Sequence, residues 1–283
     1  MSFREFVQEL PDERHHLVLL DRTQPVQVQE LLEATFPGKS VTVSEANTAD
    51  ETGAESKPAE SGLADPDAIE QVPVDATEVV VLLEDDEIVA SSPLSELTEQ
   101  LLFVNSDLYI TGSRPLEDVE LPDVLRALDD VPFRLRGYPQ SDREKLVLIA
   151  ISRFVERRAF EVGAGTIRSS FQRLSRIEDE RGTATVYERL AATDLDVHVY
   201  GIPDELPDPD RYDVLHAGRT EPFRRAWFVV HRSSASRVGR PPEQGESTTA
   251  LVAYEEEPQV WSGFWTFDED RIERIERYIE RTM

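Results

Sequence analysis

Hydrophobic and polar residues alternate along several short runs in the second half of the chain. The pattern is most regular in DVHVYG, AWFVVH, TALVAY and VWSGFW, at residues 196–201, 226–231, 249–254 and 260–265. Alternation with a period of two is typical of strands with different environments on their two faces. It places His198 and Tyr200 on one side of their strand. The four runs predict a mixed, mostly antiparallel sheet with helices packed on it.

Helical spacing of apolar residues predicts the elements around this sheet. SDRE at 141–144 has the form of a capping box, and the apolar helix that it opens should run to about residue 161. Gly163 and Gly165 should break this helix. Another helix is expected from about Thr185 to Ala192. Two further helices show a buried stripe, one formed by Ile167, Phe171, Leu174 and Ile177, and the last, capped by Asp268, formed by Ile272, Ile275 and Ile279.

The apolar pattern in the first half of the chain predicts a smaller α/β part that precedes this sheet. Apolar runs suggest a helix, a strand, a helix and a strand over residues 3–45, which favours a parallel strand pair. After the segment at about 46–76, we expect a hairpin at 79–91, a helix near 94–103, a strand at 107–112 and a helix near 121–129. The overall class is therefore α/β (α+β), with an N-terminal part over 1–130 and a second domain over 131–283.

Residues 46–76 are rich in Ala, Glu, Asp, Ser and Pro and have no periodic apolar face. Segments of this composition cannot bury enough apolar surface to offset the entropy of ordering. We expect a disordered acidic loop.

The acidic composition restricts the class of partner. A formal charge of −27 argues against binding to the phosphate backbone of nucleic acids or to an anionic membrane. Lys39, Lys57 and Lys145 are the only lysines, and the other cations are arginines. A lysine-poor, acid-rich protein fits a cytoplasm of about 1 M salt, where the Debye length is about 3 Å and self-repulsion is screened.

Candidate chemistry is sparse. The chain has no cysteine, so disulfides and thiolate catalysis are excluded. The N-terminus lacks an apolar signal core, and no apolar run approaches the roughly 20 residues that span a bilayer, so we expect a cytoplasmic protein. The adjacent pair His15 and His16 should point to opposite faces of a strand, and no set of metal ligands or catalytic residues is expected. The cofactor stays unknown.

Three tryptophans gather in the last fifth of the chain. On a strand, Trp261, Gly263 and Trp265 face the same way, and the glycine either leaves space above the sheet or lets another backbone approach. Core packing explains such indoles well. If the space is open, Trp261, Gly263 and Trp265 would form part of a ligand pocket, with Trp227 and His198 as walls.

Several stretches resemble the DICT sensory domain, a family found with diguanylate cyclases and two-component proteins. They are VGAGTIRSSFQRLSRI (162–177), VYERLAATDLDVHVYGIPD (186–204), RRAWFVVH (224–231), TALVAYE (249–255) and VWSGFWTFDEDRIERIERYI (260–279). The N-terminal half is similar to the stand-alone form of halophilic archaea. The resemblance implies a signal-sensing α/β module, suspected in light response, and brings no catalytic residues.

Together these observations predict a sensory or regulatory module without catalysis of its own. It would bind a small-molecule signal or a partner protein and act through a kinase, a cyclase or a transcription regulator. Two alternatives stay open: a small-molecule enzyme that uses the same cleft, and a purely structural interaction domain.

Overall fold

The computed structural model describes residues 2–11, 13–20, 26–36, 40–46, 78–102, 111–137, 139, 141, 144–234 and 248–283. The segment expected to be an acidic loop lies outside these residues except for its first position, and so does most of the strand expected at 107–112. The second strand of the expected hairpin is among the described residues, and its first residue, Ile88, is in a strand.

Four strands form a sheet in the N-terminal part, in the order β2-β1-β3-β4. They are β1 (His15–Leu20), β2 (Val41–Ala46), β3 (Val79–Glu84) and β4 (Glu87–Pro93). β1 and β2 pair in parallel and are connected through α2 (Val26–Thr35), and β3 and β4 form an antiparallel hairpin. The predicted parallel pair and the predicted hairpin are both confirmed. Helix α3 (Leu94–Leu97) continues into a π-helical turn, η3 (Thr98–Leu102).

Seven strands form the second sheet, in the order β5-β11-β10-β9-β6-β7-β8. They are β5 (Phe133–Arg136), β6 (Ala164–Arg173), β7 (Asp194–Ile202), β8 (Val214–Ala217), β9 (Ala226–Arg232), β10 (Thr248–Glu257) and β11 (Val260–Thr266). β6, β7 and β8 are parallel neighbours, whereas the other pairs are antiparallel. The predicted fold class is confirmed.

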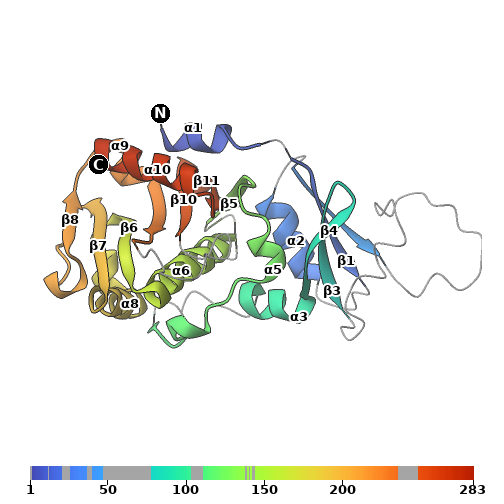
Figure 1. Cartoon of the computed structure of the whole chain (residues 1–283), viewed down its shortest axis with the longest axis horizontal. Coiled ribbons are helices and arrows are strands. Elements are labelled where there is room, and N and C mark those ends of the chain that lie inside the picture. Colours follow the sequence, from blue (N-terminus) through green and yellow to red (C-terminus); the bar gives the residue numbers. More distant parts are fainter. Residues whose placement is uncertain are drawn as a thin grey trace, which may run out of the picture.

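Helices cover both faces of this sheet (Figure 1). α6 (Glu144–Val162) and α8 (Arg181–Ala191) pack on one face, and α1 (Phe3–Gln8), α9 (Glu221–Arg225) and α10 (Glu269–Thr282) pack on the other. The shorter helical segments are η4 (Leu116–Asp118), α5 (Asp123–Arg126), α7 (Arg176–Asp179) and η5 (Pro209–Arg211).

One continuous hydrophobic cluster joins the two sheets. It includes Leu17 and Leu82 of the first sheet, Leu148 of α6 and Trp265 of the second sheet. On the face of the second sheet away from α6, α1 lies beside α10 (Figure 1). Phe3 of α1 contacts Phe228 and Tyr278 there. The first residues of the chain therefore pack with the last helix, and the division at residue 130 stays a prediction.

The predicted helix with Ile167 and Phe171 on its buried stripe is wrong, because residues 164–173 form β6. The break at the preceding glycines is correct: Gly163 and Gly165 have φ values of +62° and +109°. β6 lies inside the sheet and is buried on both faces, so its polar residues interrupt the alternation that would identify a strand.

The predicted helix caps are confirmed with one difference. Asp268 accepts a hydrogen bond from the Arg271 amide, and Ser141 Oγ accepts one from the Glu144 amide at 3.1 Å. The Glu144 side chain does not complete the capping box. Its carboxylate instead accepts hydrogen bonds from the amide and guanidinium of Arg136, at 2.7 Å in each case.

Candidate functional site

Strand β11 places Trp261 and Trp265 on the face of the sheet that α6 covers. Both side chains are only 1% exposed, and they belong to the large hydrophobic cluster. Phe264 points to the opposite face and packs with α10 residues. The alternation predicted from the sequence is confirmed, and both indoles lie in the core.

Gly263 does not leave a gap between the indoles. A Cβ atom at this position would lie 2.3 Å from the Val252 carbonyl oxygen and 2.8 Å from Ala253 Cα. Both atoms belong to the neighbouring strand β10, so the glycine permits a close approach of backbone. Of the two alternatives drawn from the sequence, the structure shows the close approach of backbone and not the open space, and ligand binding by Trp261, Gly263 and Trp265 stays a prediction.

The other two predicted residues lie on different faces of the sheet. Trp227, in β9, is half-buried; its Nε1 donates to Ser152 Oγ at 2.9 Å, and its ring meets Trp261 edge-on at 6.3 Å. Trp227 also lines a cavity. His198, in β7, hydrogen-bonds with Arg168 on the face that α10 covers. The five predicted residues therefore do not form one site.

The cavity has a volume of about 440 Å³, within the range of small-molecule sites. It lies between α6, the α7–α8 segment and strands β6 and β9. Its apolar lining includes Leu146, Ile149, Phe171, Trp227 and Val229. Three serines line the cavity, Ser152 from α6 and Ser169 and Ser170 from β6, and their small side chains occupy little of the space between helix and sheet.

The deep polar groups of the cavity largely satisfy one another. Arg153 pairs with Glu156 at 2.6 Å and donates to Thr183 Oγ1 at 2.7 Å, while the Tyr187 hydroxyl donates to Glu156 at 3.0 Å. Burial raises the pKa of Tyr187 well above its ordinary value. Ser169 Oγ lies beside the Tyr187 hydroxyl, but outside hydrogen-bond geometry. Among the residues that the structure describes, Ser169 leaves one buried hydroxyl on this floor without a hydrogen bond.

Two cations, Lys145 at the start of α6 and Arg176 at the start of α7, line the same cavity. Lys145 Nζ lies 5.6 Å from the ring centroids of both Trp227 and Trp261. Burial, and then the charge of Arg176, lowers the pKa of Lys145. Burial also lowers the pKa of Arg176.

Apart from Trp227, the residues that line this cavity were not predicted from the sequence. One signal was present: in a chain with three lysines, Lys145 lies beside the capping sequence of the longest predicted helix. The cavity itself had no signal, because it depends on the distance between α6 and β6, and β6 was expected to be a helix.

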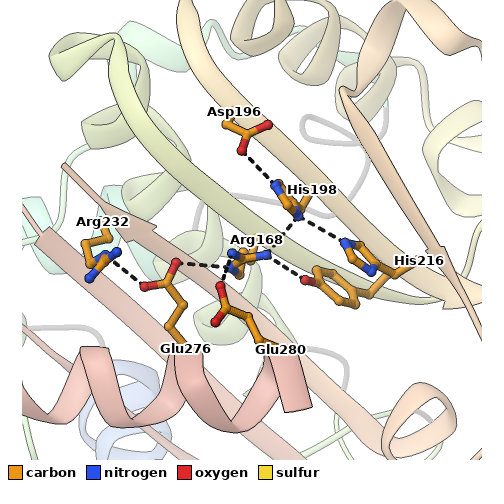
Figure 2. A network of polar contacts seen from close by, with 8 residues as sticks. Arg168, Asp196, His198, His216, Arg232, Glu276 and Glu280 are labelled. Carbon is orange, nitrogen blue, oxygen red and sulfur yellow. Dashed lines mark hydrogen bonds and ion pairs between the residues drawn. The ribbon is translucent and has the colours of Figure 1, made fainter. Parts of the chain in front are cut away.

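A second polar cluster lies on the opposite face of the sheet, centred on Arg168 of β6 (Figure 2). The Arg168 guanidinium pairs with Glu276 at 3.1 Å and with Glu280, both from α10. It also donates to the Tyr200 hydroxyl at 2.9 Å and lies 2.8 Å from His198 Nδ1. These contacts join α10 to the parallel strands, so the cluster has a structural role.

The contacts of His198 define its tautomer. Because Arg168 can only donate, His198 Nδ1 accepts, and His198 Nε2 then donates to Asp196 at 2.9 Å. His216 Nε2, 3.0 Å from the same Nδ1, must also donate. Burial, followed by His198 and Arg168, lowers the pKa of His216. His198 is therefore engaged within the protein on the face away from the cavity.

A third group was also missed. Glu13, His15 and Glu84 bring potential metal-ligand atoms within 4.8 Å of one another in the part of the chain that the structure describes. His15 and Glu84 are brought together by the pairing of β1 with β3, which the sequence does not specify.

The cavity lies between helices and the larger sheet of an α/β scaffold. Residues 124–256 match the model of a family described as the sensory domain in diguanylate cyclases and two-component systems (DICT). The matched segment is just under half of the chain and contains the cavity lining named above. No curated protein and no solved structure matches the chain. No helix in the described ranges is long and apolar enough to cross a bilayer.

Proposed function

We propose that this protein is a sensory module that takes up a small-molecule signal in the cavity lined by Lys145, Trp227 and Arg176. The proposal includes no catalysis by the protein itself. A bound ligand would change the packing of α6, and a partner signalling protein would respond. A kinase, a cyclase or a transcription regulator are the partners expected.

The observation that carries the proposal is the cavity, which lies within the segment similar to a sensory domain. Helix α6 supplies one wall of the cavity and also contacts α2, η3 and η4 of the N-terminal part. A shift of this helix on ligand binding would therefore be felt by elements outside the matched segment, which gives the signal a physical route.

The alternative of an enzyme rests on Glu156, a buried carboxylate on the cavity floor. A buried carboxylate facing a cleft is a common general acid or base. Here the two oxygens of Glu156 accept hydrogen bonds from Arg153 and Tyr187. Proton transfer to a ligand would require one of these contacts to break, so the arrangement supports binding better than catalysis.

The experiment is native mass spectrometry of the protein purified from its own host in high salt. A retained small molecule is expected in the wild type and should be lost in Ile149→Trp, which places an indole in the cavity. Val89→Trp is the matched control, because Val89 is 45% exposed on β4 and does not line the cavity. Equal retention by the wild type and both variants would refute the cavity as the site.

A further inference from the structure

The cavity contains hydrogen-bond donors without acceptors. Lys145 has three N–H donors and Arg176 has five. Neither side chain makes a hydrogen bond or an ion pair with another residue that the structure describes; the contacts of Lys145 are with the faces of Trp227 and Trp261. Two neighbouring cations at a partly buried surface therefore lack a counter-charge in direct contact.

Other cations of this protein show how unusual that is. Five other buried or half-buried arginines have a carboxylate within ion-pair distance: Arg153, Arg157, Arg168, Arg211 and Arg271. The chain has 57 acidic residues, so carboxylates are plentiful.

The nearest acidic groups do not fill this role. Glu180 and Glu255 act on both cations electrostatically but form no ion pair with either. Glu180 accepts a hydrogen bond from Thr183 at 2.9 Å, and Glu255 accepts one from the Gln259 amide at 2.8 Å. Burial outweighs their attraction, because the pKa of each cation is lowered.

The rest of the lining is suited to an apolar body. Apolar side chains line the same space as the two cations, namely Ile149, Phe171, Trp227 and Val229. A ligand that filled it would place apolar groups against these side chains and would need oxygen acceptors at the end that faces Lys145 and Arg176.

We infer that the ligand is a small organic acid, in which an apolar body enters the cavity and a carboxylate or phosphate group binds Lys145 and Arg176. This inference rests on the proposed function and specifies its ligand class. Both anionic groups offer the same chemistry to the cations, namely two or more oxygens that accept charge-assisted hydrogen bonds.

Two fluorescent probes with the same aromatic body separate the contributions. 1-Anilinonaphthalene-8-sulfonate has an anionic group, and N-phenyl-1-naphthylamine lacks it. The wild type should bind the sulfonate at least about tenfold more tightly, as expected for charge-assisted contacts in a partly buried site. Lys145→Met and Arg176→Met should each remove most of this preference, because they weaken binding of the sulfonate much more than binding of the neutral probe.

The control variant is Arg277→Met, which makes the same change of charge on α10, where Arg277 is 65% exposed and pairs with Glu273. It should preserve the preference for the sulfonate. Continued binding of the neutral probe also shows that the Lys145 and Arg176 variants keep the cavity. Displacement of the sulfonate by phenylacetate or by phenyl phosphate then distinguishes the carboxylate from the phosphate.

The possible failures are distinguishable. If both probes bind with equal affinity and Ile149→Trp blocks both, the cavity takes up small molecules and only the anionic class is refuted. If neither probe binds the wild type, the proposed function loses its support as well. A sulfonate preference that survives in both the Lys145 and Arg176 variants would also overturn the inference.

Discussion

Acidification should destabilise this protein through His231, a buried neutral histidine in β9. The side chain is 1% exposed, its Nε2 lies 3.4 Å from the Ala164 carbonyl oxygen, and its Nδ1 has no hydrogen-bond partner among the described residues. The proton must reside on Nε2, because a carbonyl can only accept. Protonation of Nδ1 would therefore bury a charge and an additional donor without an acceptor.

The size of the effect follows from the pKa of this residue. Burial, assisted by the charge of Arg158 and opposed by the Ala164 hydrogen bond, lowers the pKa of His231 from 6.5 to about 4. Above pH 6.5 the histidine is neutral in both states. Between pH 6.5 and 4 the unfolded chain binds the proton first, so the free energy of unfolding falls as the pH falls. At about 1.4 kcal/mol per pKa unit, the total loss is about 3 kcal/mol.

The assay compares urea unfolding of the wild type with His231→Gln and His231→Phe, followed by tryptophan fluorescence from pH 7.5 to 3.5. Neither variant can be protonated at this position, so each should gain about 3 kcal/mol relative to the wild type on going from pH 6.5 to pH 4. The comparison is needed because Asp129, whose pKa burial raises to about 6, contributes the opposite slope in all three proteins.

Agreement between the two variants is the control. Glutamine and phenylalanine differ in size and polarity, so their offsets at pH 7.5 should differ, whereas the pH-dependent change should be the same. A difference between wild type and variants that stays constant from pH 7 to pH 4 would refute the reasoning, because His231 would then titrate alike in the folded and unfolded chains.

Three further predictions concern packing and charge. Gly263→Ala should destabilise the fold by about 1–3 kcal/mol, measured by thermal melting, because the added Cβ would meet the backbone of β10. Binding of the neutral probe should persist. An unchanged melting temperature would show that β10 can move away from the added Cβ without cost. Ile275→Ala, at a position with 0% exposure, should cost about 2–5 kcal/mol, and Asp268→Ala, which removes the α10 cap, about 1 kcal/mol; the reverse order would contradict the packing of α10. With a charge of −27, the native circular dichroism should be lost at about 10 mM salt, where the Debye length is about 30 Å, and its retention would argue against adaptation to molar salt.

Sequence patterns predicted an element well where each of its faces has one kind of environment. The stripe of α10 is a clear case: Ile272, Ile275 and Ile279 are fully buried as expected. β6 failed for the opposite reason. Its outward residue Arg168 is buried by pairing with α10, more than 100 positions away in the sequence, so no local pattern could show that a charged residue belongs to a strand interior.

The candidate site was predictable only in part. Trp227 was correctly placed on a strand of the sheet and does line the cavity. Trp261 and Trp265 were correctly oriented, yet the space between them depends on how closely β10 approaches Gly263, which is a tertiary distance. The contributions of Lys145 and Arg176 depend on which carboxylates do not reach them, and the sequence alone does not contain that information.

The packing of α1 against α10 has a consequence for how the chain folds during synthesis. Phe3 and Phe6 complete their contacts with Tyr278, almost the whole chain away. At about 5–20 residues per second, a ribosome needs roughly 15–55 s to make the intervening residues. Throughout that time the two aromatic side chains have no native partner on α10. The nascent chain therefore exposes apolar side chains near its N-terminus until chaperones or the strands made later cover them.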